Sequence, residues 1–417
     1  MATVRHDPRT TGGPWTRLAE FPAIRRAIPE WIKRPLRQRF FSGEAYRKRL
    51  WLSNNPLRDW PEISDYPAKV KCRLGIIREA TQQHYHFMAA CRDMGVPYML
   101  LDLFDPDWID RVREADCNTF LVWPSIYMTI WKQMVDDRLP ILCENLGKRV
   151  YPSLKEIWLY ESKRRQAYWL RANSIPHPKT WVFYDLDQAL DFSRTAPLPI
   201  VAKTDTGACA SGVQILRKRA ALQAYVRRTF RRGIRRYAGD PRDRQWGMVF
   251  LQEYLPHVAE WRMVRIGDSY FGHQKLQQGQ FHSGSKLVGW FPVPEHILDF
   301  VRDLTERGSF TSMDIDVFET PDGRLLVNEL QTMFGSKRPY QMLINGQMGR
   351  YVHSAENGKW TFEPGNFCAN NSCNLRVQHV LRQEGIEIEL PDLTDYSAAN
   401  PADVEDSIRD YRTGYHV

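Results

Sequence analysis

Short apolar runs alternate with helical patterns between residues 71 and 123, and this alternation constrains the fold more than any other feature of the sequence. The runs CRLGII (72–77), PYMLLD (97–102) and CNTFLVW (117–123) have the length and composition of buried strands, and the residues after the first run have a helical pattern that ends near Gly95. Because strands that alternate with helices form βαβ units, this region predicts a parallel sheet. No GxGxxG motif follows the first strand, so the sequence does not support a nicotinamide-binding site.

The length of the chain, 417 residues, predicts two or three packed units. Hydrophobic residues at 43% and aromatic residues at 12% are enough to build cores, which excludes a wholly disordered chain. The sequence contains neither a long uninterrupted apolar run nor the apolar segment of a signal peptide, and its 7 cysteines are scattered in the manner of reduced thiols. We therefore expect a cytoplasmic protein without structural disulfides.

The net charge of +9 favours anionic partners. Arginine is concentrated in residues 217–244 and in the first 70 residues. No nucleic-acid-binding motif is recognisable, and aromatic residues do not alternate regularly with the basic ones, so we expect no nucleic acid partner. The favoured readings are a solvated helix face or a surface for an acidic substrate, such as an anionic glycan or a phosphorylated acceptor. A peripheral membrane contact through the basic N-terminal segment stays open.

Further elements are predicted along the rest of the chain. They are a long helix followed by a strand (152–185), two strands around a loop of small residues (197–216), three strands (246–277), a helix (294–308), an acidic hairpin (313–332), and an irregular tail with one helix near 375–383.

The acidic hairpin concentrates oxygen donors. MDIDVFE and VNELQT flank the turn-like stretch TPDGR, and together they contain Asp314, Asp316, Glu329 and Gln331. Carboxylate and amide oxygens suit a hard cation such as Mg²⁺, which in enzymes usually accompanies phosphates. Taken alone, the segment is equally compatible with a solvated hairpin that carries ordinary charges.

Lys203 ends an apolar strand directly before a loop of small residues that contains Gly207 and Gly212. Its ammonium group and the backbone N–H groups of such a loop converge on the same space, an arrangement that suits polyphosphate. The loop is not a Walker A motif, because neither GKS nor GKT follows.

These segments, in this order, resemble the ATP-grasp superfamily, the fold of D-alanine:D-alanine ligase and of the ligases that add glutamate to a ribosomal protein. The resemblance runs from about Leu74 to Gly335. It implies an α/β (α+β) fold in which a parallel-sheet domain precedes two α+β subdomains that clasp ATP. The implied units are a basic N-terminal extension (1–70), a pre-ATP-grasp domain (71–150), an ATP-grasp domain (151–345) with a smaller subdomain (180–253) and a larger one (254–345), and a C-terminal tail (346–417).

The phosphate-binding part of the resemblance lies in two segments. ESKRRQAYWLRANSIPHPKT resembles the family's helix that begins with a nucleotide-contacting lysine, here Lys163, although the usual aspartate before it is Ser162. IVAKTDTGACASGV resembles the phosphate lysine and its mobile glycine-rich loop. The resemblance therefore implies Lys203 at the α- and β-phosphates, with Gly207 and Gly212 in the loop.

The nucleoside part of the resemblance is the segment LQEYLP, which is similar to the linker whose backbone reads the adenine edge. It implies adenine contacts by Glu253, Tyr254 and Leu255. Glu260, seven residues after Glu253, is in the position of the family's acidic ribose ligand.

The reacting part of the resemblance begins with EWRMVRIGDSYFGHQK, which implies that Arg262 and Lys275 face the transferred phosphate and acyl group as catalytic residues. Asp316, Glu329 and Gln331 fall where the family has its metal ligands, with Gln331 in place of the usual asparagine. The hairpin is also one residue longer before Glu329 than is usual in the family. The implied cofactors are ATP and two Mg²⁺ ions, with Mn²⁺ as a possible substitute.

The resemblance implies an ADP-forming ligase that joins a small carboxylate to an amine through an acylphosphate. A kinase of the same fold, which phosphorylates a hydroxyl of an anionic small molecule or sugar, is one alternative. A non-catalytic nucleotide-binding or membrane-surface protein is another. The sequence names neither the acid nor the amine, and it leaves the oligomeric state open.

Overall fold

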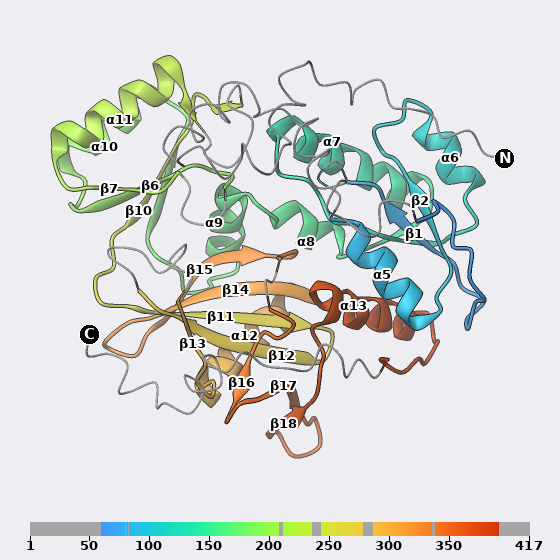
Figure 1. Ribbon diagram of the computed structural model, residues 1–417. Helices are drawn as coiled ribbons and strands as arrows, with labels where there is room; N and C mark the ends of the chain where they lie inside the picture. The colour runs from blue at the N-terminus through green and yellow to red at the C-terminus, as the bar shows by residue number, and fades with distance from the viewer. Residues whose placement is uncertain are drawn as a thin grey trace, which may run out of the picture.

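The structure of the chain, a computed structural model, contains three main sheets and a short ribbon (Figure 1). One sheet is parallel and has four strands, one is antiparallel and has four, and the largest is antiparallel and has eight. The predicted N-terminal extension lies mostly outside the described part of the chain. The structure describes residues 60–391 except for 80, 82, 208–211, 236–242, 278–286 and 336–337.

The parallel sheet confirms the prediction from the alternating pattern. Its strands, in sheet order, are β2 (Tyr98–Leu101), β1 (Leu74–Ile77), β3 (Thr119–Leu121) and β4 (Arg149–Tyr151), and its helices are α5 (Tyr85–Met94), α6 (Trp108–Glu114), α7 (Thr129–Pro140) and a π-helical turn, η2 (Ile141–Asn145). Gly75 is needed in β1 because a Cβ atom there would lie 2.1 Å from the Phe120 ring. As predicted, α5 ends at Gly95, which adopts a left-handed φ of 67°.

The segment after this sheet forms two helices, α8 (Leu154–Leu159) and α9 (Lys163–Ala172), so the prediction of one long helix was wrong. The break lies at Glu161, whose φ of 57° is left-handed and cannot continue a right-handed helix. Ser162 then caps α9 by accepting a hydrogen bond from the backbone N–H of Arg165. As a result, Lys163 is the first residue of a helix.

The smaller antiparallel sheet carries two helices on one face, and Ala167 of α9 packs against Phe250 on the other face. Its strands, in sheet order, are β5 (Thr180–Phe183), β10 (Val249–Glu253), β6 (Ile200–Lys203) and β7 (Gln214–Leu216); its helices are α10 (Leu186–Thr195) and α11 (Arg219–Arg232); and the ribbon β8 (Ile234–Arg235) with β9 (Arg244–Gln245) follows α11. Ile200 and Ala202 pack beneath the helices. Because side chains alternate along a strand, Val201 and Lys203 point to the opposite face.

The largest sheet separates an apolar core from a charged face. Its strands, in sheet order, are β15 (Leu325–Gln331), β14 (Ser312–Glu319), β11 (Ala259–Ile266), β12 (Ser269–Lys275), β17 (Gln347–His353) and β16 (Leu343–Ile344), with β13 (Val288–Gly289) paired to β12 and β18 (Trp360–Pro364) paired to β17. The predicted helix α12 (Glu295–Gly308) covers the face that carries Trp261 and Ile315. Arg262, Asp314 and Asp316 alternate with these residues and belong to the other face.

A β-bulge interrupts the pairing of β14 with β15. Asp316 pairs with Glu329, but the next residue, Val317, pairs with Val327, so Asn328 is an additional residue in β15. Val327 and Leu330 both belong to the core beneath the sheet. The bulge therefore allows the two residues between them, Asn328 and Glu329, to line the same cavity.

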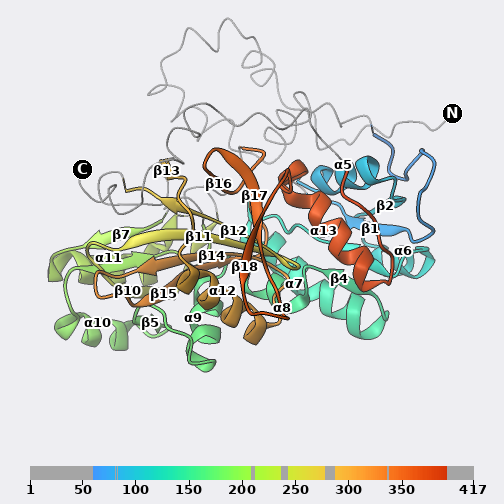
Figure 2. The same cartoon turned by 90° about the horizontal axis from the view of Figure 1, so that it is seen from below.

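The C-terminal region is more ordered than the sequence predicted. The strands β17 and β18 extend the largest sheet, so the prediction of an irregular tail was wrong for these residues. The helix α13 (Ala369–Gln383) confirms the predicted helix near 375–383 and lies beside α5 in both views (Figures 1 and 2). Val377 and Leu381 of α13 share a core with Leu74 of β1. The tail thus joins the parallel sheet to the largest sheet.

Two further predictions concern the cysteines and the helices. The six described cysteines are all free thiols, as predicted. Every helix in the described ranges is too short or too polar to span a bilayer.

Candidate active site

A cavity of about 130 Å³ lies between the smaller and the largest antiparallel sheets. It brings together residues that are far apart in the sequence and that we had predicted to act at one site. Those that line it are Lys163, Lys203, Gly207, Glu253, Tyr254, Leu255, Glu260 and Glu329.

One end of the cavity is apolar. Val201 and Ile215 lie opposite each other on β6 and β7, and Leu255 and Phe318 also line the cavity. Apolar side chains therefore reach the cavity from the smaller sheet and from β14 of the largest sheet. Such a slot suits a flat, weakly polar ring.

The other end of the cavity is basic. The Lys163 ammonium lies 2.8 Å from Glu329 Oε1 and donates a hydrogen bond of the same length to the Gly207 carbonyl. Burial alone would lower the pKa of Lys163, but the neighbouring carboxylates of Glu329 and Glu161 outweigh it and raise the pKa. Lys163 is thus a buried cation with a matched anion.

Lys203 has no such partner. Its ammonium donates a 3.0 Å hydrogen bond to Asn328 Oδ1, a neutral acceptor, and no carboxylate of the described residues lies within ion-pair distance. The side chain is only 8% exposed. Burial lowers the pKa of Lys203 to about 8, with Glu329 raising it and Lys163 lowering it further. The site therefore holds a buried cation whose charge is incompletely compensated.

The two predicted loop glycines have different places. Gly207 lines the cavity with a φ of 141°, and its N–H donates to Glu161 Oε2 over 3.1 Å. Gly212 closes the base of the loop by accepting a hydrogen bond from the Thr204 N–H. Its φ is 82°, and a Cβ atom there would lie 2.3 Å from Thr204 Oγ1, so only glycine fits.

The predicted catalytic residues form an ion-pair network beside the cavity. Lys275 contacts Glu260 at 3.0 Å and also Asp316, and Arg262 lies 3.1 Å from Asp314 and 3.4 Å from Asp316. Burial and Arg262 oppose the charge of Lys275, but the carboxylates prevail and raise its pKa. Burial acts to raise the pKa of Asp316, but Lys275 and Arg262 hold it below its usual value. The network therefore favours the charged forms of Lys275 and Asp316.

Two acceptors on this face lack donors. Asp314 and Gln331 lie opposite each other on β14 and β15. Both carboxylate oxygens of Asp314 and Oε1 of Gln331 are buried without a hydrogen bond among the described residues, although Asp314 lies near Arg262. Burial raises the pKa of Asp314 to about 7, with Arg262 lowering it and Asp316 raising it.

The three predicted metal ligands are brought together. Asp316 pairs with Glu329 across the strands, and Gln331 Nε2 donates a 2.8 Å hydrogen bond to Glu329 Oε1. Within the described residues, no group of three acidic, histidine or cysteine side chains is arranged to hold a metal ion. Lys275 contacts the Asp316 carboxylate instead, and Lys163 contacts the Glu329 carboxylate. The donor set of two carboxylates and one amide oxygen without a donor nevertheless fits a hard cation.

The Glu253 side chain, which we predicted to contact adenine, already takes part in a hydrogen bond within the fold. Its Oε1 accepts a 2.6 Å hydrogen bond from the backbone N–H of Lys179, and its own N–H donates to the Lys179 carbonyl. Glu253 therefore fastens the end of β10 to the segment before β5. Tyr254 and Leu255, which follow it, line the cavity, and Arg217 lies over the Tyr254 ring at 5.8 Å.

Several residues that line or support the cavity were not predicted. Asn328 reaches it through the bulge, and Phe318 through its position two residues beyond Asp316. Asp205 accepts hydrogen bonds from Ser162 and from the Arg164 backbone, which fixes the start of α9. The additional residue in the acidic hairpin was the one sequence signal for Asn328.

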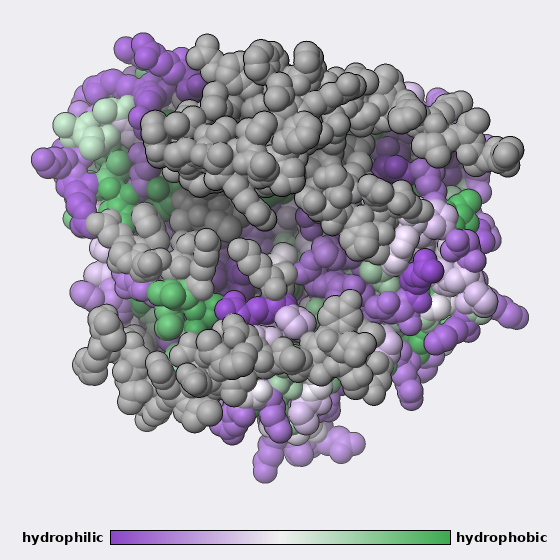
Figure 3. All heavy atoms as spheres, in the orientation of Figure 1, coloured by the Kyte–Doolittle hydropathy of each residue, from purple (hydrophilic) through white to green (hydrophobic). Residues whose placement is uncertain are grey.

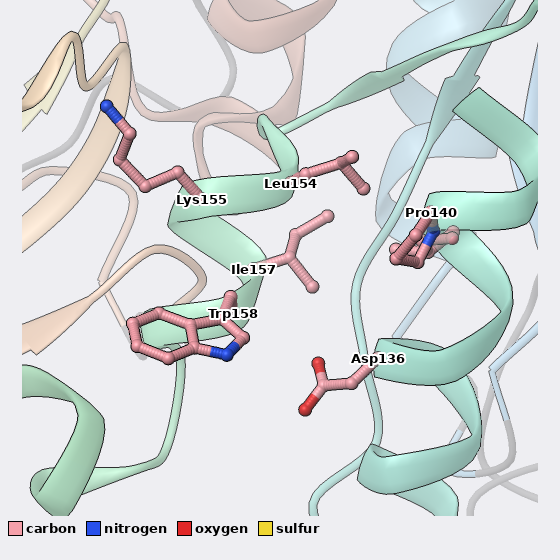
Figure 4. A pocket seen from close by; sticks show the side chains of 7 residues that line it. Asp136, Pro140, Leu154, Lys155, Ile157 and Trp158 are labelled. Atoms are coloured by element: carbon pink, nitrogen blue, oxygen red, sulfur yellow. The ribbon is translucent and has the colours of Figure 1, made fainter. Parts of the chain in front are cut away.

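A second cavity, of about 280 Å³, lies between α7 and α8 (Figure 4). Leu154, Ile157 and Trp158 line its α8 side, and Asp136 lies on the α7 side. Asp136 pairs with both Lys132 and Arg165. Because none of the predicted site residues reaches this space and its carboxylate is already neutralised, it lacks the features of a reaction site.

No family model and no curated protein matches the sequence. Solved structures similar to this chain include a RimK-domain ATP-grasp protein from Sphaerobacter thermophilus, at 17% identity, a TM-score of 0.44, and coverage of 62% of this chain and 90% of the other. N5-carboxyaminoimidazole ribonucleotide synthetase from Thermotoga maritima is similar at 17% identity, a TM-score of 0.45, and coverage of 77% and 78%.

A third similar structure is the biotin carboxylase domain of Hydrogenobacter thermophilus 2-oxoglutarate carboxylase, at 14% identity, a TM-score of 0.47, and coverage of 64% of this chain and 65% of the other. In the chain itself, a parallel sheet is followed by two antiparallel sheets with a cavity between them. The resemblance to the ATP-grasp superfamily implied this arrangement. Since identities and TM-scores are this low, the function proposed below rests on the cavity.

Proposed function

We propose that the chain is an ATP-dependent ligase that joins a small carboxylate to an amine and releases ADP and phosphate. The observation that carries this proposal is the cavity itself. It is apolar at one end, where Val201, Ile215 and Phe318 meet, and basic at the other, where Lys163 and Lys203 are buried. A nucleoside triphosphate has the same division between a flat base and a charged tail.

The incompletely compensated charge of Lys203 supports the assignment of the basic end. A buried cation without a carboxylate is costly, and a phosphate supplies the missing negative charge through strong, charge-assisted hydrogen bonds. In the proposed complex, Lys163 and Lys203 contact the phosphates. The adenine occupies the apolar slot beside Tyr254 and Leu255, and Glu260 accepts from the ribose.

Asp316, Glu329 and Gln331 are the residues that would hold Mg²⁺. Their oxygens are hard donors, and Gln331 Oε1 has no donor in the described structure. Bound Mg²⁺ supplies neutralisation of phosphate charge. Lys163 contacts Glu329, and Lys275 contacts Asp316. We assign the same two lysines to the phosphates and to the transferred group. The proposed cation ligands and the proposed phosphate ligands therefore lie next to each other.

In the proposed reaction, a substrate carboxylate attacks the γ-phosphorus of ATP, and the bond to the β-phosphate oxygen breaks to give an acylphosphate and ADP. An amine then attacks the acyl carbon, phosphate leaves, and the nitrogen loses a proton to give the amide. Arg262 and Lys275 stabilise the negative charge that develops on the transferred group. Arg262 suits this role because its side chain is 27% exposed and its planar guanidinium group binds phosphate oxygens in pairs.

The experiment is an ADP-release assay with pairs of carboxylates and amines, combined with trapping by hydroxylamine. A ligase of this kind releases ADP only when a carboxylate is present, and hydroxylamine converts its acylphosphate to a hydroxamate. ADP release with a hydroxyl compound, together with a stable phosphate ester and no hydroxamate, would show a kinase instead. Lys203→Ala is the matched variant, which should lose both products together.

A further inference from the structure

Exposed arginines gather at the end of α11 and on the ribbon that follows it. We refer to this group as the arginine surface. It consists of Arg227, Arg228, Arg231, Arg232, Arg235 and Arg244. Figure 3 shows hydrophilic side chains along the upper left edge of the molecule, where Figure 1 places α11. The first half of the arginine-dense stretch forms α11, whereas Arg236 lies outside the described residues.

Within the described ranges, the arginine surface has no acidic partners. None of its six guanidinium groups lies within ion-pair distance of a carboxylate of the described residues, although Arg228 stacks on Tyr225 and Arg244 donates to the Gly233 carbonyl. Exposed arginines elsewhere in the chain do have such partners. Examples are Arg111 with Asp105, Arg113 with Asp110, Arg324 with Asp322 and Arg382 with Glu387. The surface is therefore a concentration of unneutralised charge.

Exposed aromatic rings lie next to these arginines. Trp246 is 56% exposed and packs on the end of α11, where a Cβ atom added to Gly233 would lie 2.8 Å from its ring. The neighbour of Trp246 in the chain, Gln245, accepts a hydrogen bond from the Asp205 N–H, and Asp205 in turn holds Arg164. Hydrogen bonds thus connect the segment that carries Trp246 to the start of α9.

A second pair of rings continues this path. Tyr184 is 55% exposed, and its hydroxyl lies 3.2 Å from both Arg164 Nη1 and the hydroxyl of Tyr168, which is also exposed. Nothing in the sequence connects these residues. Hydrogen bonds through Arg164, Asp205 and Gln245 connect these two rings to the segment that carries Trp246.

This combination identifies the chemistry of the partner. Arginine binds phosphate through two parallel hydrogen bonds, and exposed aromatic rings stack on nucleobases. Charge spread over two helical turns and a ribbon fits a polyanion better than a single small anion. An acidic peptide would satisfy the arginines but offers no flat rings for Trp246 and Tyr184. A membrane would require large apolar residues on the exposed face of α11, which carries Ala220, Ala221 and Ala224 instead.

We propose that the arginine surface, with the rings of Trp246 and Tyr184, binds single-stranded nucleic acid. The absence of alternating basic and aromatic residues in the sequence had argued against such a partner, but the fold supplies the alternation in space. This binding is separate from the proposed nucleotide cavity, because α11 covers the opposite face of the smaller sheet. The two proposals can therefore fail independently.

The test is fluorescence anisotropy of the full chain with labelled single-stranded RNA and DNA across a salt series. Replacing Arg227, Arg231, Arg232 and Arg235 together by glutamine should weaken binding and reduce the slope of log affinity against log salt by roughly 3, about 0.7 for each lost phosphate contact. Trp246→Ala should weaken binding by about five- to a hundredfold without changing that slope. The circular dichroism spectrum should be the same in all variants, which verifies that they are folded.

Two matched controls sharpen the test. The quadruple change of Arg111, Arg113, Arg324 and Arg382 to glutamine removes the same charge from paired, exposed sites and should leave most of the affinity. Trp158→Ala removes a comparably exposed tryptophan and should change nothing. Equal losses in the controls would overturn the proposal, as would the absence of binding in the wild type. Poly-glutamate or anionic vesicles bound as tightly, with the same dependence on the four arginines, would also overturn it.

Discussion

The buried charges of the cavity and the exposed charges of α11 follow opposite rules. In the cavity and the network beside it, Lys163, Arg262 and Lys275 each contact a carboxylate, and Lys203 is the exception. On the arginine surface, none of the six arginines has an acidic partner among the described residues. Burial makes an unpaired charge costly, whereas water screens an exposed one.

A cation without an acidic partner therefore has a different meaning in the cavity and on the arginine surface. Because Lys203 is buried, the lack of a nearby anion costs free energy, and a bound anionic ligand would compensate this cost. The missing anion therefore indicates a binding site. Because the arginines are exposed, the lack of a nearby anion does not by itself indicate a binding site, and a second observation is needed to infer one. The exposed rings of Trp246 and Tyr184 provide it.

The largest expected effect comes from breaking a matched pair in the cavity. Glu329→Gln should abolish ADP formation, because it removes a carboxylate from the proposed cation-binding set. It should also destabilise the fold by about 3 kcal/mol, since Lys163 loses its ion-pair partner while remaining buried. The 2.8 Å contact between Lys163 and Glu329 is the reason for this expected loss of stability.

Chemical denaturation and ADP release measure both parts of this prediction. Glu114→Gln, at an exposed site on α6, is the control and should leave activity and stability unchanged. Wild-type turnover in Glu329→Gln at saturating Mg²⁺ would remove Glu329 from the site.

The second effect comes from removing the unmatched cation. Lys203→Ala should weaken binding of a non-hydrolysable ATP analogue by about 1.5 to 3 kcal/mol, roughly ten- to a hundredfold, because a charge-assisted contact to phosphate is lost. Lys218→Ala removes the same charge from an exposed position just before α11 and should leave the affinity unchanged. Calorimetric titration distinguishes the two variants. Equal affinities in both would mean that burial gives Lys203 no special role.

A third effect follows from the pKa of about 8 for Lys203 in the free protein. Below this pH the ammonium is already charged, and above it a proton must be taken up when phosphate binds. Nucleotide affinity should therefore fall as pH rises above about 8, by up to about tenfold per pH unit. Lys203→Arg stays protonated, so its affinity should be flat over the same range. A parallel decline in both proteins would assign the titration to another group.

The smallest effect contrasts one unpaired arginine with one paired arginine. Arg227 and Arg231 are like charges four residues apart on α11, so Arg227→Gln should stabilise the fold by about 0.3 kcal/mol at low salt. Arg307 on α12 pairs with Asp303 at 3.4 Å, so Arg307→Gln should destabilise it by a similar amount. Denaturation curves at low and high salt test the sign, and high salt should reduce both changes. Changes of the same sign would contradict the contrast.

Local patterns in the sequence were sufficient for much of the fold. The parallel sheet, the glycine that ends α5 and the helix α12 each follow from spacing within about a dozen residues. Lys203 before its loop and the oxygen donors of the hairpin were found in the same way. The cavity does bring Lys163, Lys203 and Glu329 together.

Features that depend on tertiary contacts could not be predicted. The break before α9 requires a left-handed Glu161, a conformation that its side chain does not signal. Asn328 meets Lys203, 125 positions away in the sequence, only because the bulge shifts the register of β15. The helix α13 forms against α5, and its apolar pattern gave no indication of that distant partner.

The most direct test of the central claim is calorimetric titration of the wild-type protein with a non-hydrolysable ATP analogue and, separately, with adenosine, both in the presence of Mg²⁺. If the apolar slot holds the base and the buried lysines hold the phosphates, the analogue should bind in the micromolar range and adenosine far more weakly. Equal affinities for the two ligands, or no binding of the analogue at millimolar concentration, would contradict the assignment of the cavity.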